Sequence, residues 1–221
     1  MADVLIIGAS GGIGSAIASA CAERGDRVAG LSRSVDGLDV TSESSVSHHL
    51  GAMEGPFDLV LVATGALEIA GAEPEKSIKA IRAQAMLDQF ALNAVGPALI
   101  LRHLPDLLPR KGRSVAAFLS ARVGSIGDNR LGGWIGYRSA KAALNQIVRT
   151  GAIELSRSHP DALCVALHPG TVATEFTRKY LGRHPSVSPE EAAENLLRVI
   201  DSLAARDMGQ FFDWAGKAVP W

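Results

Sequence analysis

Short apolar runs alternate along this chain with longer segments of helical period, and this alternation constrains the fold more than any other feature. Strands are predicted near residues 3–8, 27–32, 57–63, 114–120, 162–167 and 209–213, and helices over 12–24, 42–53, 82–108, 136–158 and 188–205. Such an order is typical of βαβ units around a parallel sheet. The run Leu59-Val60-Leu61-Val62 is continuously apolar, as expected of a strand buried on both faces. We therefore predict an α/β fold with a doubly wound parallel sheet.

No repeat, linker or low-complexity tract divides the chain, so residues 1–221 are expected to form a single domain. Between Arg33 and Thr41 there is too little chain for both a full helix and a full strand. We expect the short piece Leu38-Asp39-Val40 to form a reduced edge strand after the second strand.

The charge balance favours a small-molecule partner. Lys and Arg number 22 against 23 Asp and Glu, and a field this weak recruits neither nucleic acid nor an anionic membrane. No apolar run reaches the roughly 18 residues of a membrane span. The N-terminus enters a strand without a basic leader, so a cytoplasmic location is expected. His48 and His49 have no second ligand pair at a useful spacing, so no metal is expected.

A glycine-rich turn, Gly8-Ala9-Ser10-Gly11-Gly12-Ile13-Gly14, follows the first strand and opens the first helix. Glycines let the backbone turn sharply and approach a pyrophosphate without an intervening Cβ. The helix then directs its unpaired N–H groups at the anion. The alternative is a tight strand-to-helix connection with no ligand. The position after an apolar strand favours a Rossmann-type dinucleotide site.

The end of the second strand, Leu31-Ser32-Arg33, carries no acid that would accept hydrogen bonds from an adenosine ribose. An arginine there can pair with a 2′-phosphate. Arg33 therefore favours NADPH over NADH, although it can also be an ordinary surface arginine. Asp36 is the main risk to this prediction, because a rearranged loop could bring its carboxylate to the ribose.

Tyr137 and Lys141 lie four residues apart near the start of the long helix predicted over 136–158. Residues at this spacing share one helix face, so both side chains can reach one site. A nearby cation is expected to lower the pKa of the tyrosine, which could then donate a proton to a developing alkoxide. The pair alone is weak support for an active site, but together with the glycine-rich turn it is strong.

With these residues the chain resembles the short-chain dehydrogenase/reductase family over nearly its whole length. The resemblance rests on Gly8, Gly12 and Gly14, on Asp39-Val40, on Asn93, on the tyrosine–lysine pair and on the turn Pro169-Gly170-Thr171-Val172-Ala173-Thr174. The run from Arg122 to Asn129 and the C-terminal Val-Pro-Trp are similar to a narrower branch of small carbonyl reductases, which includes the C-factor and Sniffer proteins.

The resemblance implies roles for individual residues. Tyr137 would be the general acid/base, Lys141 would position the ribose and tune Tyr137, and Asn93 would hold a water in a proton relay. Val172 and Thr174 would hold the nicotinamide amide. The full set of predicted cofactor contacts is Gly8, Ser10, Gly11, Gly12, Ile13, Gly14, Arg33, Asp39, Val40, Ala63, Thr64, Gly65, Tyr137, Lys141, Pro169, Gly170, Val172 and Thr174.

Two departures from the family pattern matter. Ala63-Thr64-Gly65 stands where the family usually has Asn-Ala-Gly, and the threonine hydroxyl could replace part of the amide bonding. Ala121 occupies the place of the usual catalytic serine. Ser120 is the first candidate substitute and Ser125 the second. If Ser120 is the substitute, its replacement by alanine should lower activity at least about tenfold.

Two functions remain open at this point. The first is an NADPH-dependent carbonyl reductase acting on a small carbonyl or alcohol substrate. The second, suggested by Ala121, is a dinucleotide-binding signalling or scaffold protein with weakened catalysis. Apolar residues around the helices at 82–108 and 136–158 predict a homodimer or homotetramer. The resemblance places a substrate lid at 175–185, which is short here, and His168 could line the cleft.

Overall fold

The computed structural model describes residues 1–180 and 185–221, and within them the core is one six-stranded parallel sheet in the order β2-β1-β3-β4-β5-β6. The strands are β1 (Asp3–Ile7), β2 (Arg27–Leu31), β3 (Leu59–Val62), β4 (Ser114–Leu119), β5 (Ala162–His168) and β6 (Phe211–Asp213). The order reverses between β1 and β3, which is where open α/β sheets bind ligands. The predicted parallel Rossmann-type sheet is confirmed.

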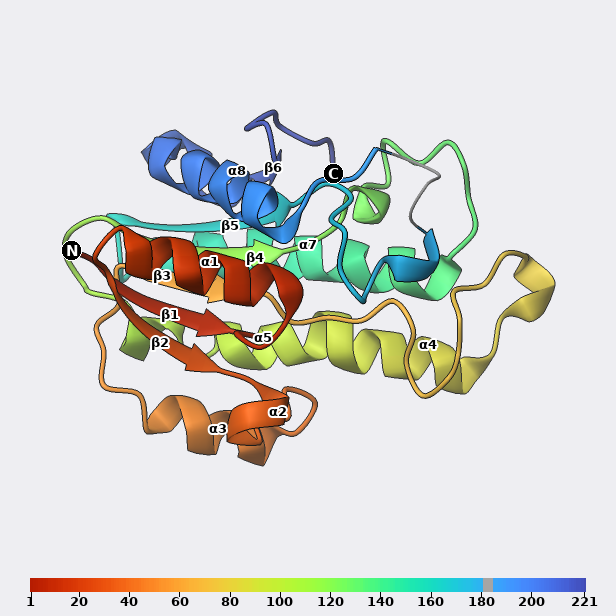
Figure 1. Cartoon of the computed structure of the whole chain (residues 1–221), viewed down its shortest axis with the longest axis horizontal. Coiled ribbons are helices and arrows are strands. Elements are labelled where there is room, and N and C mark those ends of the chain that lie inside the picture. The colour runs from red at the N-terminus through yellow and green to blue at the C-terminus, as the bar shows by residue number, and fades with distance from the viewer. Residues whose placement is uncertain (181–184) are drawn as a thin grey trace.

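Helices cover both faces of the sheet (Figure 1). On one face lie α1 (Gly12–Glu23) and α8 (Pro189–Ser202), and on the other lie α3 (Glu43–Gly51), α4 (Ala83–Phe90), α5 (Gly96–Leu101) and α7 (Ile135–Leu155). Alternate residues of each strand enter opposite cores: Val4 and Ile6 pack with α1 and α8, whereas Leu5 and Ile7 pack with α3, α5 and α7. This period of two follows from the pleat of the strand.

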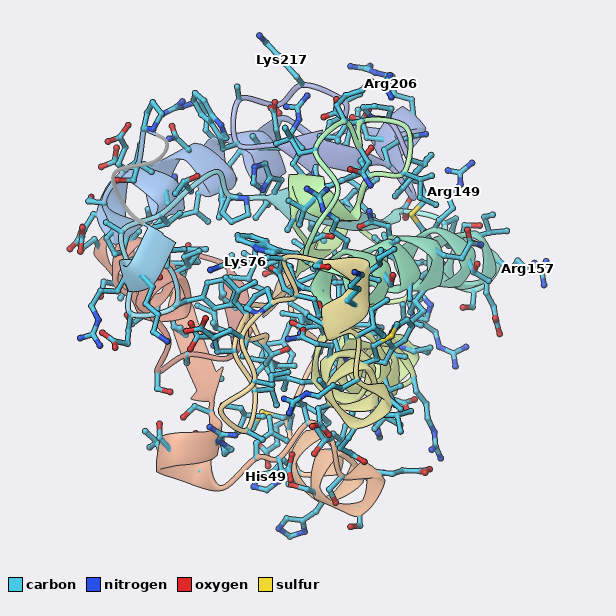
Figure 2. All side chains as sticks on the ribbon, turned by 90° about the vertical axis from the view of Figure 1, so that its right-hand side faces the viewer. His49, Lys76, Arg149, Arg157, Arg206 and Lys217 are labelled. Carbon is cyan, nitrogen blue, oxygen red and sulfur yellow. The ribbon has the colours of Figure 1, made fainter. Side chains whose placement is uncertain are left out.

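Figure 2 shows the two ends of the strand order. His49, on α3 beside the β2 end, lies opposite Lys217, which follows β6. The remaining short turns of helix are α2 (Arg33–Asp36), η1 (Ile78–Ala80), η2 (Ala91–Val95), α6 (Leu104–Leu107), η3 (Arg122–Gly124), η4 (Arg178–Tyr180) and η5 (Ala205–Asp207). In the described part of the chain, no helix combines the length and the apolar character that crossing a membrane requires.

The helix predicted as one piece over 82–108 is divided in the structure. A π-helical turn, η2, separates α4 from α5, and α6 follows as a separate turn. Pro97 and Pro105 lack an N–H group and so cannot continue the regular helical hydrogen bonding. Single π turns of this kind commonly occur at functional sites, and this one carries Asn93.

The predicted edge strand at Leu38-Asp39-Val40 is wrong, because these residues form no strand. Instead, Ser32 caps the short helix α2, and the chain then turns directly toward α3. The side chains of Leu38 and Val40 are buried in the core on the α3 side, and Asp39 accepts hydrogen bonds from Thr41. The apolar side chains at 38 and 40 therefore serve core packing and not strand pairing.

Candidate active site

A groove runs across the carboxyl ends of the strands and has two connected compartments. The inner compartment, about 360 Å³, is bordered by Ala121, Tyr137, Lys141, His168, the Pro169–Thr174 turn and the start of α1. The outer compartment, about 620 Å³, is bordered by Ser32, Arg33, Asp39, Val40 and the loop after β3. Both compartments share Ser10, Gly11, Ala63, Thr64 and Gly65.

The glycine-rich turn has the close backbone packing that a pyrophosphate site needs. A Cβ at Gly14 would lie 2.2 Å from the Gly8 carbonyl oxygen, and one at Gly12 would lie 2.6 Å from Thr174 Cγ2. Gly8 has a φ of 98°, in the region that favours glycine. No side chain caps the N-terminus of α1 at Gly11. Its backbone N–H groups and positive dipole end therefore suit an anion.

Arg33 is the only positively charged residue among the described residues that border the outer compartment. Asp36 does not border this compartment, and its carboxylate accepts the backbone N–H of Ser32 at 2.7 Å and the Ser32 hydroxyl at 3.2 Å. Hydrogen bonds from Thr41 hold the pKa of Asp39 below its ordinary value. The structure therefore presents Arg33, and not Asp36, at the end of β2.

The loop after β3 offers a further polar group to a ligand. The hydroxyl oxygen of Thr64 is buried without a hydrogen-bond partner and borders both compartments. A buried polar atom without a partner is costly, and a dinucleotide in the groove would satisfy it. Together with the uncapped helix terminus, this atom shows that the residues present fit a dinucleotide.

Asn93 fixes this loop from behind. Its amide nitrogen donates to the Ala66 carbonyl at 2.9 Å and to Gln89 Oε1 at 2.8 Å, and its oxygen accepts the Ala66 N–H at 3.2 Å. A Cβ at Gly65 would lie only 2.7 Å from Asn93 Oδ1, so glycine is required at that position. Asn93 is fully buried and does not border either compartment of the groove.

Tyr137 and Lys141 both border the inner compartment, on one face of α7. Lys141 Nζ donates to the Leu119 carbonyl at 2.9 Å and lies 6.0 Å from the centre of the Tyr137 ring. Burial raises the pKa of Tyr137 above its ordinary value and lowers the pKa of Lys141 to about 7. The expected lowering of the tyrosine pKa is therefore not found, because desolvation disfavours both charged forms.

The three positions considered for the missing serine differ in their surroundings. Ala121 borders the inner compartment with extended backbone. Ser120 also borders it, but its hydroxyl donates to Asn145 Oδ1 at 2.6 Å within the core beside α7. The Ser125 hydroxyl donates to the Pro220 carbonyl and accepts the N–H of Asp128, so it is engaged away from the groove.

Further residues surround Tyr137 and the start of α7. Glu75 accepts the N–H of Gly136 at 3.1 Å, which places a carboxylate at the N-terminus of α7. The rings of Trp134 and Phe176 lie 6.4 Å and 6.3 Å from that of Tyr137. Local patterns could not predict the contact of Glu75, because this residue lies 61 residues before Gly136 in the chain. Phe176 likewise lies far from Tyr137 in the sequence.

Part of the expected lid segment contacts the loop after β3. Lys179, on η4, forms ion pairs with Glu68 at 2.7 Å and Glu73 at 2.9 Å. Residues 181–184 of that segment lie outside the described residues. Within the described part of the chain, no cluster of three or more His, Cys, Asp or Glu is arranged to hold a metal ion.

A parallel sheet with a glycine-rich turn at its switch point, and a tyrosine and a lysine beside the same groove, defines a dinucleotide-dependent oxidoreductase. Residues 29–203 match a family model described as "Enoyl-(Acyl carrier protein) reductase". The chain belongs to the short-chain dehydrogenase/reductase family.

Individual proteins agree with this assignment. A 1-hydroxy-2-glutathionyl-2-methyl-3-butene dehydrogenase of Rhodococcus sp. strain AD45 is 32% identical over 100% of both chains. The C-signal protein of Myxococcus xanthus is 34% identical over 62% of this chain and 78% of that one. A short-chain dehydrogenase/reductase from Burkholderia multivorans, solved with bound NADP, has a TM-score of 0.81 and 25% identity and covers 100% of this chain and 99% of that one.

Proposed function

We propose that this oxidoreductase reduces a small carbonyl compound with NADPH and, in reverse, oxidises the matching alcohol. One observation carries the proposal: Tyr137 and Lys141 border the compartment that begins at the glycine-rich turn. A proton donor and an anion-binding helix terminus thus face one continuous space.

The dinucleotide would lie along the groove. The pyrophosphate would rest on the turn from Gly8 to Gly14, the adenosine half beside Arg33, Asp39 and Val40, and the nicotinamide half beside Ala63, Thr64, Gly65, Pro169, Gly170, Val172 and Thr174. When bound, it supplies the hydride that the carbonyl carbon accepts. The exposed guanidinium of Arg33 supports NADPH over NADH, and the Burkholderia relative was solved with NADP.

Tyr137 would donate the proton that the carbonyl oxygen needs as the alcohol forms. Burial favours the neutral phenol, and the neutral phenol is the proton-carrying form that reduction requires. Lys141 is held by the Leu119 carbonyl within the same compartment. We propose that Lys141 contacts the ribose and, when protonated, stabilises the phenolate that remains after proton transfer.

Asn93 and Ser120 would support the site from inside the protein. Both hydrogens of the Asn93 amide are already used to hold the Ala66 loop and Gln89. We therefore propose that Asn93 positions Gly65. The Asn93 oxygen already accepts the Ala66 N–H and has one further lone pair that would accept from a water in a proton relay. The Ser120 hydroxyl is bonded to Asn145. For Ser120 we propose support of the β4 end in place of the direct catalytic role considered from the sequence.

An NADPH-consumption assay with aldehydes, ketones and quinones tests this function. We expect turnover of at least one carbonyl class, with loss of turnover in Tyr137→Phe.

The C-signal relative and Ala121 support the second candidate, a dinucleotide-binding protein with weak catalysis. Tight NADPH binding without turnover of any carbonyl would favour that candidate over the reductase.

The assembly and the location are also proposals. Helices α4 and α7 and the π turn leave the large apolar side chains of Leu87, Ile153 and Val95 at least 48% exposed. We propose that this surface pairs two copies in a homodimer or homotetramer, which light scattering would test.

We further propose that residues 1–221 act as one dinucleotide-binding unit, which limited proteolysis would test. We also propose that the protein is cytoplasmic, which cell fractionation would test.

A further inference from the structure

Three polar residues stand side by side at the carboxyl ends of β4, β5 and β6. Leu119 pairs with Leu167, so Ser120 lies beside His168 on the next strand. His168 in turn pairs with Asp213. Each lies two residues after a strand residue whose side chain is in the core on the α7 side, namely Phe118, Ala166 and Phe211. The row therefore lies on the same face of the sheet as the helix that carries Tyr137.

The two outer members of the row are already engaged. Ser120 donates to Asn145 Oδ1 at 2.6 Å. The carboxylate of Asp213 accepts the backbone N–H groups of Ala215 and Lys217, each at 3.0 Å, and lies 3.7 Å from Arg122. The row is therefore not a serine–histidine–aspartate relay, because the hydrogen bonds of Ser120 and Asp213 lead away from the histidine.

His168 differs from both neighbours. It borders the inner compartment with Tyr137, Lys141 and Ala121. Its Nδ1 atom is fully buried and has no hydrogen-bond partner. Burial, together with the charge of Arg122, lowers the pKa of His168 to about 4, so the imidazole is neutral near pH 7. A neutral imidazole carries one N–H donor and one acceptor.

The surroundings indicate which nitrogen carries the hydrogen. An N–H at the enclosed Nδ1 would be buried without an acceptor, which is a rare and costly arrangement. The hydrogen is therefore better placed on Nε2, at the opposite edge of the ring. Since the residue borders the inner compartment and Nδ1 is enclosed, this opposite edge is the one available to a ligand.

We propose that His168, through Nε2–H, donates to the substrate carbonyl oxygen the hydrogen bond that an alanine at position 121 cannot supply. This inference rests on the proposed carbonyl reduction. No proton is transferred from His168: Tyr137 gives its proton to the oxygen, and the imidazole stabilises the developing negative charge from a second side. Preorganised neutral donors of this kind act mainly in the transition state.

The test compares three variants at position 168 with NADPH and 4-nitrobenzaldehyde. His168→Phe keeps a ring but removes both nitrogens, His168→Gln places an amide N–H near the Nε2 position, and His168→Asn places one near Nδ1. We expect His168→Phe and His168→Asn to lower kcat/KM at least about tenfold, whereas His168→Gln stays within about threefold of wild type. The Kd for NADPH, measured by fluorescence titration, should change less than about twofold in every variant that folds.

A second comparison separates a direct donor from a packing role. Ala121→Ser restores a hydroxyl at position 121. We expect it to raise kcat/KM at least about tenfold in the His168→Phe background but less than about threefold in wild type, because either donor can serve the same oxygen. Equal effects in both backgrounds, or an unchanged kcat/KM in His168→Phe, would overturn the inference. If wild type itself reduces no carbonyl, the proposed function fails first, and that result is distinct from a silent His168.

Discussion

The two compartments of the groove use charge in opposite ways. In the outer compartment, Arg33 and Asp39 are exposed. In the inner compartment, Tyr137 is 5% exposed and Lys141 3% exposed, and burial displaces both pKa values. An exposed charge interacts only weakly with its neighbours, because water screens it. A buried charge interacts more strongly, but its burial costs free energy because it loses contact with water. The preference between NADPH and NADH should therefore change readily on mutation without loss of activity, whereas substitutions in the inner compartment should lower the rate of the reaction itself.

Replacing Tyr137 with phenylalanine is expected to have the largest effect. The variant loses the proposed proton donor but keeps the ring that packs near Trp134 and Phe176. We expect kcat/KM to fall by about 10³ or more, within the range of general acid catalysis, while NADPH binding is retained. Steady-state kinetics and a binding titration measure the two quantities. A fall in affinity as large as the fall in rate would show that the compartments are not separable.

The charge of Lys141 should produce the next largest effect, visible in the pH profile. The pKa of about 7 means that the ammonium is present below this pH and lost above it. If the cation stabilises the phenolate of Tyr137 as proposed, kcat/KM for reduction should fall as pH rises through about 7.

Lys141→Arg serves as the matched control for this pH prediction. Guanidinium keeps its charge throughout this range, so the variant should be less active overall but show no loss on the alkaline side. A wild-type profile that stays flat to about pH 9 would contradict the assignment of the titration to Lys141.

Arg33→Ala should have a moderate effect confined to the outer compartment. A charge-assisted pair with a phosphate contributes about 1.5–3 kcal/mol. We therefore expect the preference for NADPH over NADH to fall at least about tenfold, with little change in kcat at saturating cofactor. Arg24→Ala is the matched control, because that arginine pairs with Asp201 and does not border the groove. Equal wild-type affinities for the two cofactors would refute the prediction.

Among the substitutions in the inner compartment, Ser120→Ala is expected to have the smallest effect on kcat/KM. The hydroxyl is bonded to Asn145, so its removal leaves a buried acceptor without its donor, which costs about 1–3 kcal/mol of stability. Thermal unfolding should show a lower Tm, by about 2–4 °C for each kcal/mol. The fall in kcat/KM should stay below the tenfold loss inferred from sequence alone. A larger fall would return Ser120 to the catalytic role.

The elements and the principal motifs could be predicted from the sequence. The six strands and the helices α1, α3, α7 and α8 agree with their predicted ranges within a few residues. This success has a physical cause: hydrophobic period and glycine placement are local properties. Two predictions failed. The apolar pattern of Leu38 and Val40 predicted an edge strand, but their side chains pack in the core without strand pairing. The helix predicted over 82–108 is divided into shorter helices beside its prolines.

The sequence by itself therefore determined a parallel α/β sheet, a glycine-rich turn between its first strand and first helix, and a tyrosine–lysine pair on one helix. Only the tertiary structure decided which polar groups meet around them. The hydrogen bond from Ser120 to Asn145 joins residues 25 apart, and that from the Gly136 N–H to Glu75 joins residues 61 apart. The register of β4 and β5 places His168 beside Ser120, and the packing around His168 leaves its Nδ1 atom buried without a hydrogen-bond partner. Such contacts depend on how separate elements pack, which no local pattern of residues records.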